Sequence, residues 1–93
     1  MIKDFKDRNT EEVFNRRQVK SLPPDIQRTA LRKLRMLDAA TTLSDLRNPP
    51  GNKLKKMERE RKGQFSIRIN DQWRICFVWE NGDAHDVEIA DVH

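Results

Sequence analysis

The spacing of apolar residues changes from helical to strand-like at Gly51. Before Gly51, apolar positions within 22–40 recur every three or four residues, which is the period of one helix face. Beyond it, apolar and polar residues alternate, as they do in strands that bury one face of a sheet. The helical stripe consists of Ile26, Ala30, Leu34 and Leu37. The pattern predicts helices in the first half of the chain and strands in the second.

Capping residues place the first elements. The start of the chain, "MIKDF" at 1–5, predicts a short opening strand. The segment that follows contains Asn9 and Glu12 at the spacing of a capping box, ahead of two apolar residues. This spacing predicts a short helix that begins at Asn9 and ends near Arg17.

Proline and glycine residues place the remaining elements. Pro23 and Pro24 begin the second helix, because proline suits the first helical turn. A capping pattern at 42–45 predicts a brief helical turn, which "NPPG" at 48–51 ends. This order predicts one α+β domain over residues 1–93, with the opening strand and two helices packed on one face of a mainly antiparallel, twisted sheet. The strands are expected at about 53–57, 64–69, 73–79 and 84–90.

The stretch "SIRINDQWRICF" at 66–77 predicts a hairpin with an arginine in each strand. Because side chains alternate along a strand, the apolar residues of both strands can face the core only if the loop has an odd length. A three-residue loop meets this condition. Ile69 then pairs with Trp73, and Arg68 lies directly opposite Arg74.

Like charges directly opposite each other destabilise a sheet, so the two arginines need an anion nearby. One alternative is a bound polyanion. The other is Glu88 or Asp86 of the next strand, and an odd-length loop within "WENGDA" would place Glu88 on the arginine face. A strict two-residue turn at 81–82 would place Val87 there instead. The sequence leaves both alternatives open.

Charge is concentrated rather than spread. Charged residues make up 37% of the chain. Segment 53–62 holds six basic residues and two acidic ones, so its net charge of +4 equals that of the whole chain. Segment 80–93 holds five acidic residues and no lysine or arginine. A basic loop near arginine-bearing strands is expected for binding to a polyanion such as nucleic acid, although solvated loops also carry such runs. Arg28, Arg32 and Arg35 lie on the other faces of the second helix, where solvated charge is favoured over a partner-binding stripe.

Few residue types remain for chemistry. Cys76 is the only cysteine, which leaves no internal disulfide, and His85 and His93 form no compact metal-ligand spacing with it. The chain has no glycine-rich phosphate loop and no nucleophile elbow. Catalysis would therefore use arginine, lysine and histidine on a substrate with its own nucleophile, such as the 2′-hydroxyl of RNA. No apolar run reaches the length of a signal peptide or membrane span, so a soluble, cytosolic protein without a membrane partner is expected.

Several motifs carry a family resemblance. They are "NKL" at 52–54, "GQFSIRINDQWRICF" at 63–77, "NGDA" at 81–84, "VEI" at 87–89 and the closing "DVH". Together they resemble the HigB branch of the RelE-type toxins, over essentially the whole chain. The resemblance implies the toxin of a type II toxin–antitoxin pair, which enters the ribosomal A site and cleaves the mRNA being translated. The implied partners are the ribosome with its mRNA and a helix-turn-helix antitoxin (HigA-like), through which the toxin meets operator DNA only indirectly.

The resemblance also implies roles for single residues. Arg74 in "QWRI" matches the arginine expected to stabilise the scissile phosphate, and Arg68 would be a second phosphate contact. His93 matches the terminal histidine implicated in proton transfer, with Asp91 as its orienting neighbour. No metal or cofactor is implied. Ribosomal RNA and the mRNA backbone would be held by Lys53, Lys55, Lys56, Arg59, Arg61 and Lys62.

Four positions depart from the residues usual in that family. Lys55 replaces a histidine, Glu58 a lysine, Arg59 a glycine and Val92 an aromatic residue. A glutamate near a phosphate repels it unless a neighbouring lysine, Lys55 or Lys56, compensates. Two hypotheses follow: an active, ribosome-dependent endoribonuclease, or a catalytically weakened toxin that acts as a ribosome- or antitoxin-binding module and operon co-regulator. A third, direct DNA binding by the basic loop, has no recognition-helix motif to support it.

Overall fold

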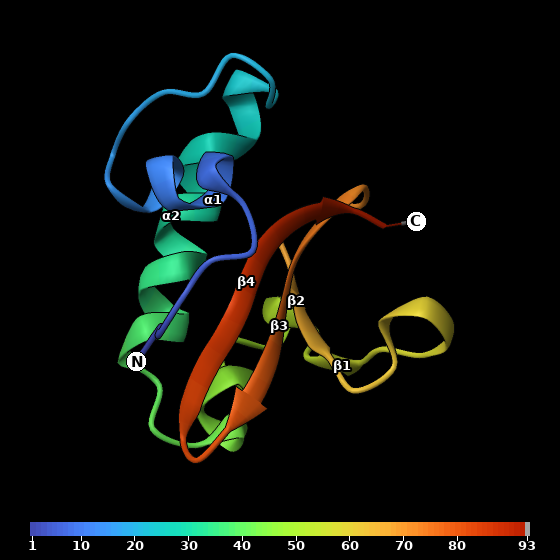
Figure 1. The fold of residues 1–93 in the computed structure, drawn as a ribbon. Coiled ribbons are helices and arrows are strands. Elements are labelled where there is room, and N and C mark those ends of the chain that lie inside the picture. Colours follow the sequence, from blue (N-terminus) through green and yellow to red (C-terminus); the bar gives the residue numbers. More distant parts are fainter. Residues whose placement is uncertain (93) are drawn as a thin grey trace.

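Two helices lie on one face of a four-stranded antiparallel sheet in the computed structural model, which describes residues 1–92 (Figure 1). The helices are α1 (Arg8–Phe14) and α2 (Pro24–Ala39), followed by the short 3-10 helices η1 (Leu43–Arg47), η2 (Pro50–Asn52) and η3 (Arg59–Arg61). The strands, in their spatial order, are β1 (Lys55–Lys56), β2 (Phe65–Arg68), β3 (Trp73–Glu80) and β4 (Asp83–Asp91). The predicted α+β fold is confirmed. In the part of the chain that is described, no helix is both long and apolar enough to cross a membrane.

Helix α1 begins and ends earlier than its sequence pattern predicts. The Asp7 carboxylate caps it by accepting a hydrogen bond of 2.7 Å from the backbone N–H of Thr10. The predicted cap, Asn9, lies inside the helix and donates instead to the hydroxyl of Ser21. The helix stops at Phe14 because the chain reverses at Arg16, which has a positive φ of 65°. The prediction of a cap at Asn9 was therefore wrong, since two possible cap residues stand within one turn of each other.

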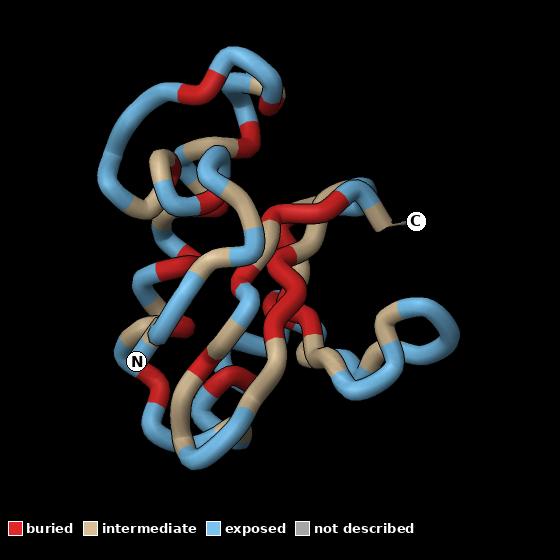
Figure 2. Tube along the Cα trace, viewed as in Figure 1, coloured by how far each residue is buried: buried red, intermediate tan, exposed pale blue. Residues whose placement is uncertain are grey.

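Helix α2 buries the apolar stripe that its spacing predicts. Ala30, Leu34 and Leu37 are fully inaccessible to solvent, and they meet the apolar face of the sheet where the buried residues gather (Figure 2). The loop before the helix is held by Gln27, whose side-chain amide bonds both the N–H and the carbonyl of Val19. The entry to α2 is thus fixed by backbone contacts as well as by the prolines.

A buried polar pair joins α2 to the segment after η1. The Lys33 ammonium, only 5% exposed, donates to the side-chain oxygen of Asn52, which is fully buried. The amide of Asn52 in turn donates to the carbonyls of Leu46 and Asn48, each at 3.2 Å. Burial lowers the pKa of Lys33, and the nearby charges of arginines on the helix and sheet lower it further. This contact holds the "NPPG" turn against the helix and presents the next residue, Lys53, to the sheet.

Replacing Asn52 should therefore destabilise the fold strongly. We expect Asn52→Ala to lower the free energy of unfolding by about 2–3 kcal/mol, because a buried ammonium loses its acceptor and two carbonyls lose their donor. Urea denaturation of the variant measures this. Adding Lys33→Met should recover part of the loss, since the unpaired charge is removed. An unchanged unfolding midpoint for Asn52→Ala would show that the pair does not stabilise the fold.

The hairpin of β2 and β3 has the register predicted from side-chain parity. Ile67 pairs with Ile75 and Arg68 with Arg74, while the N–H of Ile69 donates to the carbonyl of Trp73 at 2.9 Å. Ile67 and Ile75 are fully buried against the helices. The two arginines therefore lie opposite each other on the sheet face that is turned away from the core.

The hairpin of β3 and β4 has both a two-residue turn and Glu88 on the arginine face, which the sequence analysis treated as mutually exclusive. The turn has two residues, since Glu80 pairs with Asp83, yet Glu88 still pairs with Cys76 on the arginine face. A bulge at Asp86, whose φ is 51°, inserts the residue that changes the parity of β4. The expectation that a two-residue turn places Val87 on the arginine face was wrong: Val87 is fully buried in the core.

The strands predicted at 1–5 and at 53–57 are shorter than expected. The start of the chain runs parallel to β4, but its β-pairing with that strand consists of two isolated bridges, at Ile2 and Phe5, rather than a continuous strand. Its backbone N–H groups at Lys3 and Lys6 donate to β4 carbonyls at 2.8 and 2.9 Å. The strand expected at 53–57 consists only of the two residues of β1. Most of the basic loop between β1 and β2 is consequently irregular and projects from the sheet edge (Figure 1).

Candidate functional site

The candidate site is built on the sheet face that the helices leave uncovered. Strand pairing aligns Ser66 with Cys76 and Glu88, and aligns Arg68 with Arg74 and Ala90. These six side chains form two adjacent rows on one face, which we call the arginine face. It combines cations, a hydroxyl, a thiol and one carboxylate in a space between the basic loop and the end of β4.

Arg74 is oriented by neutral acceptors. Its Nε donates to the Ser66 hydroxyl at 2.7 Å, and one terminal nitrogen donates to the carbonyl of Lys53 at 2.5 Å. Burial lowers the pKa of Arg74, and the neighbouring charge of Arg68 lowers it further. No carboxylate from residues 1–92 pairs with it. A half-buried guanidinium held in place without a counter-ion is suited to bind an anion such as a phosphate.

Arg68 is paired, but not with the acids that the sequence suggested. Its terminal nitrogen lies 2.6 Å from the carboxylate of Asp71 in the hairpin loop, rather than near Glu88 or Asp86. The hydrogen bond from Arg68 lowers the pKa of Asp71, which is completely exposed to solvent. Exposed pairs of this kind are weak. An incoming phosphate can therefore compete with Asp71 for Arg68.

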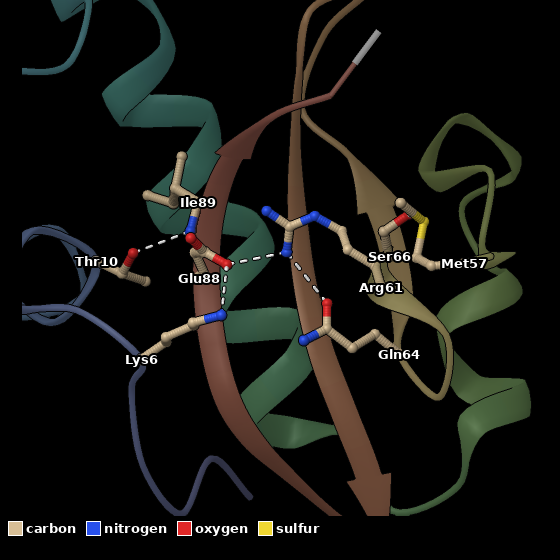
Figure 3. Close-up of polar contacts among 8 residues, drawn as sticks. All are labelled: Lys6, Thr10, Met57, Arg61, Gln64, Ser66, Glu88 and Ile89. Atoms are coloured by element: carbon tan, nitrogen blue, oxygen red, sulfur yellow. Dashed lines mark hydrogen bonds and ion pairs between the residues drawn. The ribbon is translucent and has the colours of Figure 1, made fainter. Parts of the chain in front are cut away.

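Glu88 neutralises a residue of the basic loop instead of the hairpin arginines. Its carboxylate lies 3.0 Å from Arg61 and 4.0 Å from Lys6, and Arg61 also donates to Gln64 at 3.2 Å (Figure 3). The side chains of Arg61 and Glu88 are only 26% and 20% exposed. This cluster ties the loop to β4 and to the start of the chain. The sequence placed Glu88 on this face as one alternative, but it did not pair Glu88 with Arg61, because the two residues are 27 positions apart and no local pattern joins them.

This cluster predicts a measurable effect on stability. We expect Glu88→Gln to lower the free energy of unfolding by about 1 kcal/mol, because Arg61 keeps a hydrogen-bond partner but loses its counter-charge. Glu80→Gln, at an exposed position at the end of β3, is the matched control and should leave stability unchanged. Chemical denaturation of the two variants compares them. Equal stability of both variants would remove the role assigned to Glu88.

The six basic residues of the loop have different surroundings. Lys53 adopts a left-handed backbone conformation and points its carbonyl at Arg74. Arg61 is occupied by Glu88, so its positive charge is already compensated. The rest are exposed to solvent: Lys55, Lys56, Arg59 and Lys62. The loop therefore presents most of its charge outward while one arginine anchors it.

A groove of about 600 Å³ lies between the basic loop and the end of β4. Asp91 lies at its edge, where its carboxylate accepts a hydrogen bond of 2.9 Å from the side chain of Gln72. His93, the predicted proton-transfer residue, lies outside the described residues. The groove is lined by Glu58, Arg59, Glu60, Arg61, Asp91 and Val92. Three of the four positions that depart from the family pattern thus lie in one groove, beside the predicted orienting residue Asp91.

Ser66 is a further site residue that sequence reasoning passed over. It is fully buried, its hydroxyl accepts from Arg74, and the same oxygen lies 3.1 Å from the sulfur of Met57. Its position was available from the strand parity that placed Arg68, because Ser66 is two residues earlier in β2. What parity does not show is that Ser66 and the Lys53 carbonyl hold the same guanidinium.

The fold and this charged face together make a small α+β domain of the kind expected for a RelE-like toxin. Residues 3–93 match the family described as "RelE-like toxin of type II toxin-antitoxin system HigB". The chain therefore belongs to the HigB-like family of RelE-like toxins, which confirms the resemblance drawn from its motifs. The family description pairs such a toxin with an antitoxin.

Individual relatives support the same assignment. "Toxin HigB-1" of Vibrio cholerae is 41% identical over 85 residues, which cover 90% of each chain. "Endoribonuclease HigB" of Proteus vulgaris is 34% identical over 94 aligned positions that span both chains completely. An uncharacterized protein of Haemophilus influenzae is 33% identical over 66 residues, or 71% of this chain and 65% of that protein. The name of the Proteus protein shows that one full-length relative acts on RNA.

Proposed function

We propose that this chain is the toxin of a type II pair and cleaves mRNA in the ribosomal A site. The observation that carries the proposal is the oriented Arg74, which no carboxylate of the described chain neutralises. The full-length likeness to a protein named as an endoribonuclease supports RNA as the substrate. The basic loop supports binding of a polyanion, through phosphate contacts that carry no sequence information.

The proposed reaction uses the nucleophile of the RNA itself. The 2′-hydroxyl attacks the adjacent phosphorus, the bond to the 5′-oxygen of the next nucleotide breaks, and a 2′,3′-cyclic phosphate and a 5′-hydroxyl result. Arg74 stabilises the negative charge that develops on the phosphate oxygens, and Arg68 exchanges Asp71 for a second phosphate contact. His93 accepts the proton that the 2′-hydroxyl loses and delivers it to the departing 5′-oxygen, with Asp91 orienting the histidine. No metal or cofactor has a step in this scheme.

The partners follow from the same proposal. The ribosome positions the mRNA, since the phosphate contacts of the arginine face and the basic loop carry no sequence information. A helix-turn-helix antitoxin neutralises the chain, and operator DNA is met only through the complex of the two. The site of action is then the cytoplasm, where translating ribosomes are found.

The test is to map the 5′ ends of transcripts after the chain is produced without its antitoxin. We expect new ends at defined positions within translated codons, and none in untranslated regions. Breaks that appear equally in untranslated RNA would contradict ribosome dependence. An accompanying reaction with naked RNA should show little cleavage.

A weakened toxin is the second candidate function, and the groove is the observation that favours it. Three carboxylates line this groove against two guanidiniums, so its lining has no net positive charge to attract a phosphate. Val92, in the same groove, offers no aromatic ring for stacking on a base. In that case transcripts stay intact while the chain sediments with ribosomes. The same mapping experiment, combined with ribosome pelleting, separates the two functions.

A further inference from the structure

Two adjoining hollows run along the side of α2 that is turned away from the sheet. One, of about 450 Å³, lies between α2 and the turn that follows α1. The other, of about 490 Å³, continues along α2 past Met36. Arg16, Arg28 and Leu31 line both hollows, so the two form a single surface, which we call the α2 groove. It lies on the opposite side of the sheet from Arg74.

The rim of the α2 groove carries cations that nothing in the described chain neutralises. Arg16, Arg28, Arg32 and Arg35 are all exposed, and none has an ion-pair partner among residues 1–92. By contrast, Arg17 next to them lies 3.1 Å from Glu12. Arginines three and four residues apart on a helix repel each other, so the isolated domain gains no stability from this arrangement. The cluster is therefore better explained by a partner than by the fold.

The floor of the groove is apolar. Val13 lies in it at only 2% exposure, and Leu31 and Met36 are half-buried. None of the described residues that line it is aromatic, whereas sites for single-stranded RNA use aromatic rings to stack bases. An apolar floor between cationic rims instead matches an amphipathic helix with carboxylates along both edges. The sixteen residues of α2 offer a length of about 24 Å for such a helix.

We propose that the α2 groove is the docking surface for an acidic amphipathic helix of the antitoxin. The inference rests on the proposed function, in which this chain has an antitoxin partner. Leu31 and Met36 receive the apolar side of that helix, and Arg16, Arg28, Arg32 and Arg35 pair with its carboxylates. The arginine face does not take part in this contact.

The experiment measures binding of the small protein encoded beside this chain's gene. The full-length chain and three variants are titrated with it by calorimetry: Arg28→Glu with Arg32→Glu, Lys3→Glu with Arg47→Glu, and Arg74→Ala. The first two variants change the net charge equally, but Lys3 and Arg47 lie outside the groove. We expect the groove variant to bind at least tenfold more weakly, and the other two to bind within twofold of the unaltered chain.

A milder variant tests whether weaker binding could result from a loss of folding. Arg28→Gln with Arg32→Gln removes the charges without reversing them, and it should weaken binding several-fold while the thermal melt stays unchanged. If the groove variants bind within twofold of the unaltered chain, the inference about the α2 groove is overturned, while the proposed toxin–antitoxin pairing still stands. Failure of the unaltered chain to bind its neighbour's product would overturn both. If the groove variants bind the antitoxin normally but no longer pellet with ribosomes, RNA is the occupant of the α2 groove, and the inference is also overturned.

Discussion

Arg74→Ala is expected to abolish the growth arrest that follows production of this chain without its antitoxin. The guanidinium is already oriented by Ser66 and by the carbonyl of Lys53, so it needs no rearrangement when charge develops on the phosphate. Loss of one such preorganised donor typically slows a reaction about 10²–10³-fold. Primer extension on a translated mRNA measures the rate of cleavage.

Arg74→Lys separates charge from geometry. A lysine keeps the positive charge but cannot donate to Ser66 and to a phosphate in the same fixed plane, so we expect only partial recovery of cleavage. Circular dichroism confirms folding of both variants. Undiminished arrest by folded Arg74→Ala protein would remove this residue from the mechanism.

His93→Ala is expected to give the second large effect. General acid–base catalysis by a positioned histidine contributes about 10²–10⁴-fold, so cleavage should fall by at least 10²-fold while ribosome binding persists. The same primer-extension assay, run beside ribosome pelleting, measures both properties.

The other histidine provides a matched control. His85 lies near the start of β4, where its ring is 3.6 Å from Asp4 and away from Arg74, so His85→Gln should leave cleavage unchanged. Equal activity of the His93 and His85 variants would mean that another group transfers the proton. A variant with intact binding and no cleavage would conversely separate the two proposed functions within one protein.

Much of the fold could be predicted because it depends on local repeats. The three- and four-residue spacing of Ala30, Leu34 and Leu37 specifies one face of α2 whatever surrounds it. Alternation likewise fixes which side chains of β2 and β3 share a face, so Arg68 and Arg74 were correctly paired. The cap of α1 was misplaced because Asp7 and Asn9 both satisfy the local rule, and only the folded chain selects between them.

The candidate site was predicted less completely, since its contacts join distant segments. The bulge at Asp86 changes the parity of β4 without any periodic cue, and it alone brings Glu88 to the arginine face. The same bulge gives Arg61 a counter-ion 27 residues away along the chain. Sequence reasoning therefore offered Glu88 as a partner of the hairpin arginines, whereas the structure pairs it with the basic loop.

By itself, the sequence determined the class of fold, the hairpin register and the family, because periodicity, loop length and contiguous motifs are properties of neighbouring residues. Only the tertiary structure decided which cations are neutralised. Arg61 and Arg68 have carboxylate partners, whereas Arg74 is held by a hydroxyl and a carbonyl and meets no carboxylate among residues 1–92. The physical reason is that charge compensation depends on distances across the sheet, which bulges and buried contacts such as Lys33–Asn52 set once the chain has folded.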